Sequence, residues 1–146
     1  MYYVNRKQIE TILGQIPDIN TGLRGASASW DGGTFMGLVQ ERCLHLAIEV
    51  VTDVGSSLID GFIMRDAGSY EDIISIIHEE KVFAGSGLYD LLIQLVALRK
   101  PLVQDYYVWD RTALHPLATL LPEALEQFAA EVRSYLDLEL GAQAPV

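Results

Sequence analysis

One segment in the second half of the chain gathers side chains that could handle a phosphate group. It reads LRKPLVQDYY over residues 98–107. Arg99 offers a permanently charged fork of hydrogen-bond donors, and Lys100 adds a second positive charge. Gln104 can hydrogen-bond, but its amide does not titrate near neutral pH. The exposed phenol groups expected of Tyr106 and Tyr107 add hydroxyls, so the segment suits phosphate binding better than proton transfer.

A second set of polar residues recurs along the apolar stretch 36–60. Arg42, Glu49 and Asp53 are seven and four residues apart, so on a helix all three project from one face. Two carboxylates on one stripe could bind a metal or act in acid–base chemistry. However, the chain has no ExxH pair and no second carboxylate stripe, as a di-metal bundle requires. The favoured interpretation is a half-buried lattice of ion pairs in which Arg99 is the partner of Glu49 or Asp53.

The remaining chemistry-bearing residues give no sign of a metal or cofactor site. None of the three histidines has a second His or Cys at zinc-ligand spacing, and Cys43 is the sole cysteine. The chain contains no Walker loop and no GxGxxG sequence. We therefore predict that the protein binds no metal and no cofactor.

The order and spacing of these motifs resemble the HepT-like branch of the HEPN superfamily of bacterial proteins. That family ends its penultimate helix with Arg, four residues, His, one residue and Tyr. Arg99 and Tyr106 match the Arg and the Tyr, and Gln104 stands at the His position. Upstream, residues 41–53 resemble the family's long helix and residues 68–72 the segment after it. The resemblance covers residues 41–138.

The resemblance implies an all-helical bundle that dimerises, with the motifs of both subunits lining a shared cleft. Active members of the family are metal-independent ribonucleases that act as toxins. Their partner is a small nucleotidyltransferase antitoxin, which adds AMP to the motif tyrosine, here Tyr106. In that chemistry the Arg holds the scissile phosphate and the His moves protons at the ribose hydroxyl; Arg99 and Gln104 occupy these positions.

Three functions are compatible with the departures from the family motif. Gln104 cannot act as a general acid or base, and Lys100 replaces a small polar residue. The first reading is a degenerate, dimeric module that binds RNA or protein. The second is an active endoribonuclease with a rearranged site that recruits His115 or Tyr106. The third is a helical partner protein without a nucleic-acid role, which the net charge of −10 favours.

Apolar periodicity predicts an all-α, up-and-down bundle of about five helices that forms one domain over residues 1–146. We expect helices over residues 6–16, 36–60, 70–80, 88–106 and 111–138, with a kink near Arg99 because Pro101 follows it. Asp110 is expected to cap the last helix. Glycine, serine and threonine residues in 18–34 predict a flexible loop, anchored by Trp30, and residues 141–146 a frayed tail.

Composition also limits the cellular compartments in which the protein is expected. Half of the residues are hydrophobic, which is enough to form a core, but no apolar run approaches the ~20 residues that a membrane span needs. The N-terminus lacks the apolar segment of a secretory signal, and a single cysteine cannot form an internal disulfide. These features predict a cytoplasmic protein that does not enter a membrane.

Overall fold

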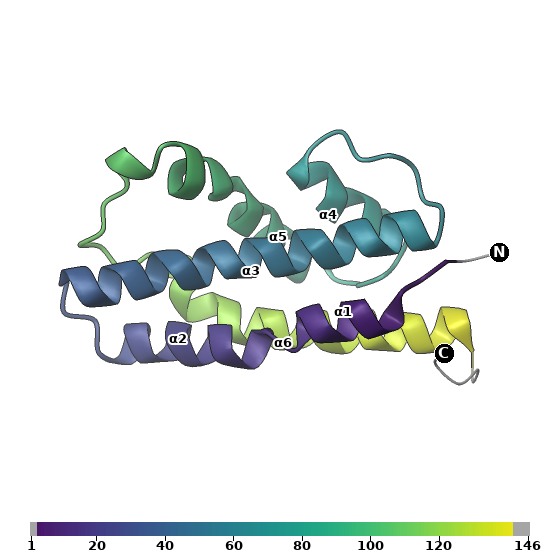
Figure 1. Cartoon of the computed structure of the whole chain (residues 1–146), viewed down its shortest axis with the longest axis horizontal. Helices are drawn as coiled ribbons and strands as arrows, with labels where there is room; N and C mark the ends of the chain where they lie inside the picture. Colours follow the sequence, from purple (N-terminus) through teal and green to yellow (C-terminus); the bar gives the residue numbers. More distant parts are fainter. Residues whose placement is uncertain (1–2, 142–146) are drawn as a thin grey trace.

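The regular structure of the chain is entirely helical over the residues that the computed structural model describes, 3–141 (Figure 1). The predicted fold class, an all-α bundle, is confirmed. Six α-helices occur in this range, together with a π-helix, η1 (Lys100–Gln104), and a 3-10 turn, η2 (Tyr106–Val108). The α-helices are α1 (Arg6–Leu13), α2 (Ile16–Ala28), α3 (Thr34–Gly61), α4 (Tyr70–Glu79), α5 (Ser86–Ala97) and α6 (Pro116–Leu140).

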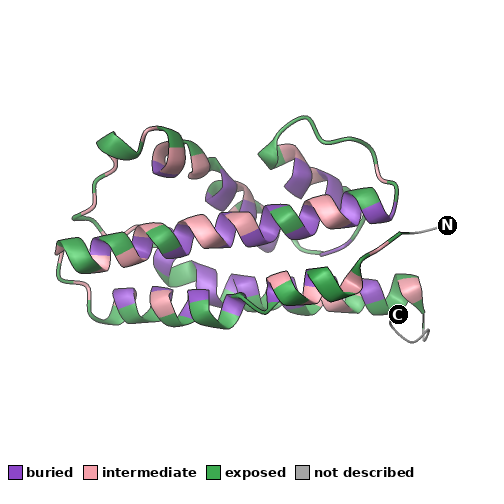
Figure 2. Cartoon of the chain, viewed as in Figure 1, coloured by how far each residue is buried: buried purple, intermediate pink, exposed green. Residues whose placement is uncertain are grey.

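The long helix α3 is the centre of the bundle. It contacts each of the other five α-helices: α1, α2 and α6 lie on one side of it, and α4 and α5 on the other (Figure 1). Burial over a broad arc of α3 explains this position: Leu44, Ile48 and Val51 form one buried stripe, Val50 and Val54 are buried on one side of it, and Ile59 on the other. Figure 2 shows buried residues along the length of this helix. None of the helices in residues 3–141 is long and apolar enough to cross a membrane.

Two glycines let neighbouring segments approach the backbone of α3 closely. A Cβ atom on Gly55 would lie 2.4 Å from Cγ2 of Ile73, so α4 packs directly on this position. A Cβ atom on Gly37 would lie 2.3 Å from Cγ of Arg111 and 2.6 Å from its carbonyl oxygen. Gly37 therefore sets how closely the connection before α6 lies against the start of α3.

The predicted flexible loop over residues 18–34 is wrong for most of its length, because α2 extends from Ile16 to Ala28. Pro17 lies in the first turn of this helix, where it is tolerated because the N–H groups of a first turn have no partner within the helix. Gly22 is a packing residue: a Cβ atom there would lie 2.3 Å from Sγ of Cys43. Only residues 29–33 remain outside helices, and Trp30 anchors them by donating from Nε1 to the Thr112 carbonyl oxygen at 3.2 Å.

The last helix also begins later than predicted. Asp110 accepts hydrogen bonds from the backbone and hydroxyl of Thr112 and so closes a separate turn, while His115 is the N-cap and Pro116 the first residue of α6. Pro122 is accommodated inside α6. Of the tail predicted to fray, residues 142–146 lie outside the described part of the chain.

Candidate functional site

The segment 98–107, here called the motif segment, begins where the α-helical hydrogen bonding of α5 ends. Pro101 has no N–H to donate to the Ala97 carbonyl, and α5 ends at Ala97. The chain continues as the five-residue π-helix η1, in which the backbone N–H of Asp105 donates to the Lys100 carbonyl at 2.9 Å. The predicted break near Arg99 is thus confirmed. Because π-helical bonds span five residues, Gln104 follows Arg99 by about one turn, and such turns are frequent at functional sites.

Arg99 is half-buried and lies against an aromatic ring. Its Cζ atom is 4.3 Å from the centre of the Tyr70 ring, and its Nε atom is buried without a hydrogen-bond partner. The predicted ion pair with Glu49 or Asp53 is wrong, since none of the ion pairs within residues 3–141 includes Arg99. The aromatic face, in place of a carboxylate, compensates the buried part of this cation.

The polar stripe on α3 forms contacts within its own helix. Arg42 donates from Nη1 to Nδ1 of His45 at 3.4 Å, and Nε2 of His45 lies 3.4 Å from Oε1 of Glu49. Lost solvation raises the pKa of Asp53, and the negative charge of Glu49 raises it further. His45, which the sequence pattern did not single out, thus lies on the same stripe between Arg42 and Glu49. Within residues 3–141 no three His, Cys, Asp or Glu side chains are grouped as metal ligands.

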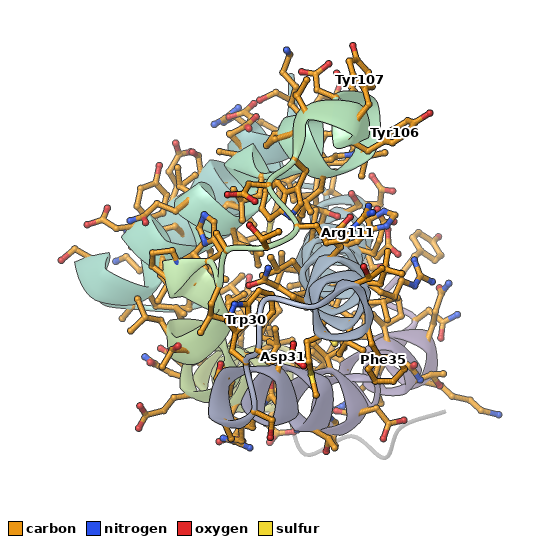
Figure 3. The ribbon with its side chains drawn as sticks, turned by 90° about the vertical axis from the view of Figure 1, so that its left-hand side faces the viewer. Trp30, Asp31, Phe35, Tyr106, Tyr107 and Arg111 are labelled. Carbon is orange, nitrogen blue, oxygen red and sulfur yellow. The ribbon has the colours of Figure 1, made fainter. Side chains whose placement is uncertain are left out.

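The other predicted site residues lie on the exposed side of the motif segment. Gln104 is exposed, and Nζ of Lys100 pairs with Oδ2 of Asp105 at 2.9 Å. Tyr106 and Tyr107 are 60% and 74% exposed, with their rings edge to face at 5.6 Å (Figure 3). The structure thus brings Arg99, Lys100, Gln104 and both tyrosines onto one short segment, and η1 contacts α3.

A buried glutamine on α3 holds the connection that follows this segment. Gln40 is fully buried; its Nε2 donates to the Ala113 carbonyl at 3.2 Å, and its Oε1 accepts from the backbone N–H of His115 at 2.7 Å. Beside it, Arg111 forms an ion pair with Glu41 through two hydrogen bonds, and this pair raises the pKa of Arg111. We call these contacts the Gln40 clamp. They were not predicted from the sequence, where the only signal was a lone amide in an apolar helix.

His115 is held in its neutral form by the same connection. Its ring stacks on Trp109 with centroids 5.9 Å apart, and its Nδ1 accepts from the backbone N–H of Leu117 at 3.1 Å. Burial lowers the pKa of His115. The ring therefore caps α6, an arrangement that protonation of Nδ1 would abolish.

A pH-dependent contribution to stability follows from this cap. Because the pKa of His115 is lower in the folded chain than its ordinary value of about 6.5, the unfolded chain takes up the proton first. The stabilisation is complete above the ordinary pKa of about 6.5. It is lost as the pH falls from this value through the lower pKa of the folded chain. Asn at this position keeps a capping acceptor without titrating. We expect the urea midpoint of His115→Asn to fall less than that of the wild type between pH 8 and 5; parallel curves would contradict this assignment.

Comparison with known proteins identifies the family. The family model for HepT-like ribonucleases matches residues 28–132, which include the whole motif segment. The chain belongs to the HepT-like ribonuclease family. The resemblance inferred from Arg99, Tyr106 and the upstream motifs is therefore confirmed.

Two findings on one HepT-like relative extend the match to nearly the full chain. A Bacillus subtilis (strain 168) protein named "Putative RNase YutE" is 41% identical over 141 residues, which cover 97% of this chain and 96% of the relative. A solved structure titled "Structure of Cytosolic Protein of Unknown Function YutE from Bacillus subtilis" superposes with a TM-score of 0.85 at 39% identity and covers 100% of both chains. The fold is thus shared with an experimentally determined structure.

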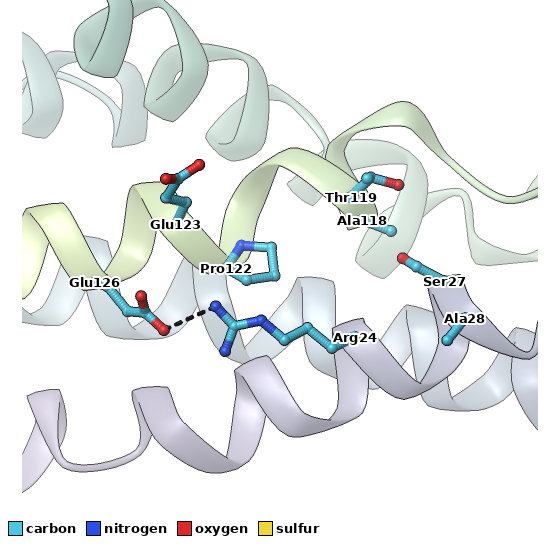
Figure 4. Close-up of a pocket in the computed structure, with 8 residues that line it drawn as sticks. All are labelled: Arg24, Ser27, Ala28, Ala118, Thr119, Pro122, Glu123 and Glu126. Atoms are coloured by element: carbon cyan, nitrogen blue, oxygen red, sulfur yellow. Dashed lines mark hydrogen bonds and ion pairs between the residues drawn. The ribbon is translucent and has the colours of Figure 1, made fainter.

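A separate hollow of about 500 Å³ lies between α2 and α6 of this HepT-like chain (Figure 4). Nη2 of Arg24 pairs with Oε1 of Glu126 at 2.9 Å across it. None of its lining residues belongs to the motif segment or to the Gln40 clamp. The lining residues are Arg24, Ser27, Ala28, Ala118, Thr119, Pro122, Glu123 and Glu126.

Proposed function

We propose that this HepT-like protein is a dimeric module with a degenerate ribonuclease motif, which binds RNA and cleaves it poorly. The observation that carries the proposal is the motif segment itself. Arg99 has no acidic partner among the described residues, and the exposed residue one π-turn later is Gln104 instead of the family's His. The phosphate-binding member of the motif is kept while the proton-transfer member is replaced.

RNA binding is supported by the free positive charge on the motif segment. The Arg99 guanidinium keeps its Nη donors for a phosphate, because the Tyr70 ring accepts none of them in a conventional hydrogen bond and only Nε is buried. The Lys100 side chain is largely exposed although its partner Asp105 is half-buried, so exchanging this ion pair for a phosphate contact costs little. Arg42 is exposed on the neighbouring helix. About three phosphate contacts on single-stranded RNA would give a slope of log affinity against log salt of about −2.

Weak cleavage is supported by the absence of a free proton acceptor on the motif segment. Attack by a ribose 2′-hydroxyl needs a group that takes up a proton near neutral pH, and an amide does not. The histidines nearest to this end of the bundle are engaged: His45 with Glu49, and His115 with the start of α6. Positioning and charge stabilisation by Arg99 can still leave some activity.

Dimerisation is supported by exposed apolar side chains at one end of the bundle. Phe35 on α3 is 76% exposed and Val108 is 71% exposed, and Tyr106 and Tyr107 lie at the same end (Figure 3). A second copy of the chain would cover these side chains and bring two motif segments together.

The proposed partner is a nucleotidyltransferase antitoxin of the kind known for the family. Tyr106 is exposed, so its hydroxyl is accessible for addition of AMP. A bulky anionic group at Tyr106 would lie close to Arg99 in sequence and would compete with RNA phosphate for it. The proposed setting is the cytoplasm, where such pairs act.

Binding and assembly test this proposal together. We expect sedimentation at micromolar concentration to give a dimer, and Arg99→Ala to weaken binding of single-stranded RNA by about 10- to 100-fold, the worth of a charge-assisted contact. Arg24→Ala removes a positive charge far from the motif and should leave binding unchanged. A monomer would contradict the dimer, and absence of RNA binding would favour the acidic partner protein without a nucleic-acid role.

A further inference from the structure

The half-buried cation of Arg99 is balanced by an aromatic ring and by no carboxylate. Its Nε atom is buried without a hydrogen-bond partner, and Cζ lies 4.3 Å from the centre of the Tyr70 ring. A guanidinium at this distance is attracted by the negative face of the ring. The attraction holds the group in place without occupying its N–H donors, whereas a carboxylate would bind them and cancel the charge.

The Tyr70 ring is 40% exposed, but the backbone that carries it is fixed, because Tyr70 is the first residue of α4 and this end of the helix is hydrogen-bonded on both sides. Ser69 caps it by accepting from the backbone N–H of Asp72 at 3.0 Å. The carboxylate of Asp72 accepts from the backbone N–H of Gly68 at 2.9 Å. Arg65 donates to both oxygens of Asp72 at 2.9 Å each and also reaches Glu79.

The acidic residues in the first turn of α4 do not pair with Arg99. Asp72 is engaged by Arg65, which holds the pKa of that carboxyl below its ordinary value. Glu71, the other acidic residue of the first turn, is exposed. Neither of these two carboxylates forms an ion pair with Arg99, so the Tyr70 ring is the partner that α4 offers to this cation.

We propose that Tyr70 is a positioning residue of the RNA site, which holds the Arg99 guanidinium in place with its Nη donors free for a phosphate. The inference rests on the proposed function but adds a residue from a different helix, 29 positions before Arg99. What matters is the aromatic face, so the Tyr70 hydroxyl is dispensable. Phe at this position preserves the site, and Leu, which fills similar space without a π-face, loosens it.

Binding measurements on four variants test the role of the ring. We expect Tyr70→Phe to bind single-stranded RNA within twofold of the wild type and Tyr70→Leu to bind about 3- to 10-fold more weakly. The double variant Tyr70→Leu/Arg99→Ala should bind no more weakly than Arg99→Ala alone, because Tyr70 acts through Arg99. Unchanged binding by Tyr70→Leu, equal losses in Leu and Phe, or additive losses in the double variant would each overturn the proposal.

An NMR measurement tests the contact without RNA. The Tyr70 ring should shift the side-chain resonances of Arg99 upfield in the wild type and in Tyr70→Phe, and the shift should disappear in Tyr70→Leu. If the ring shift is present and no variant binds RNA, the proposed function fails while the contact stands, and Tyr70 has no RNA-site role. If the ring shift is absent in the wild type, the inference fails even when RNA binds.

Discussion

Replacing Gln104 with His is expected to raise RNA cleavage by about 10²- to 10⁴-fold, the usual worth of general acid–base catalysis. The change restores a group that titrates near neutral pH at the position where the HepT-like family has its His. Gln104 is exposed at the end of η1, so an imidazole meets no packed neighbour there. The measurement is the initial cleavage rate of a single-stranded RNA in chelator-treated, metal-free buffer.

Two controls make this result specific to proton transfer. Gln104→Asn keeps an amide and should cleave no faster than the wild type. Adding Arg99→Ala to Gln104→His should abolish the gain, because the phosphate is no longer held. If Gln104→His changes only the melting temperature, the side chain serves the end of the π-helix and the proposed role of this position is wrong.

The largest expected effect on stability is at the Gln40 clamp. In Gln40→Met, the Ala113 carbonyl and the His115 N–H lose their partner, and each of these part-buried hydrogen bonds is worth about 0.5–1.5 kcal/mol. The free energy of unfolding should therefore fall by about 1–3 kcal/mol, measured by urea denaturation at an unchanged m-value. Gln127→Met is the matched control, because Gln127 makes an exposed hydrogen bond to Glu131 and should change stability by less than about 0.5 kcal/mol. Equal losses in both variants would show that burial of Gln40 is irrelevant.

Much of the fold follows from local sequence patterns. The wrong prediction of a loop in place of α2 has a physical cause. The central position of α3 and the break before Pro101 depend on apolar periodicity and on a missing N–H, which a sequence displays directly. The helix α2 was missed because Gly22 and its polar neighbours are typical of loops. Gly22 is instead required by the closeness of Cys43, a contact made only after the chain has folded.

The candidate site likewise combines features that are visible in the local sequence with contacts that exist only in the folded chain. Arg99, Gln104 and Tyr106 stand out in the sequence because their spacing along one segment is itself the family signal, and their roles stay predictions. The partner of Arg99 could not, since a charge-based search offers Glu49 or Asp53, whereas the observed partner is the uncharged ring of Tyr70. Gln40 was missed because the groups it binds, at Ala113 and His115, are backbone atoms more than 70 positions away.

The central claim is that this HepT-like chain keeps the phosphate-binding half of its motif and lacks the proton-transfer half. Its most direct test is the metal-free cleavage rate of the wild type beside Arg99→Ala and Gln104→Ala, with RNA binding measured on the same samples. The account predicts RNA binding that depends on Arg99, with at most weak cleavage that Gln104→Ala does not reduce further. Robust metal-independent cleavage by the wild type, lost in Arg99→Ala and unchanged in Gln104→Ala, would contradict it and point to a different catalytic base.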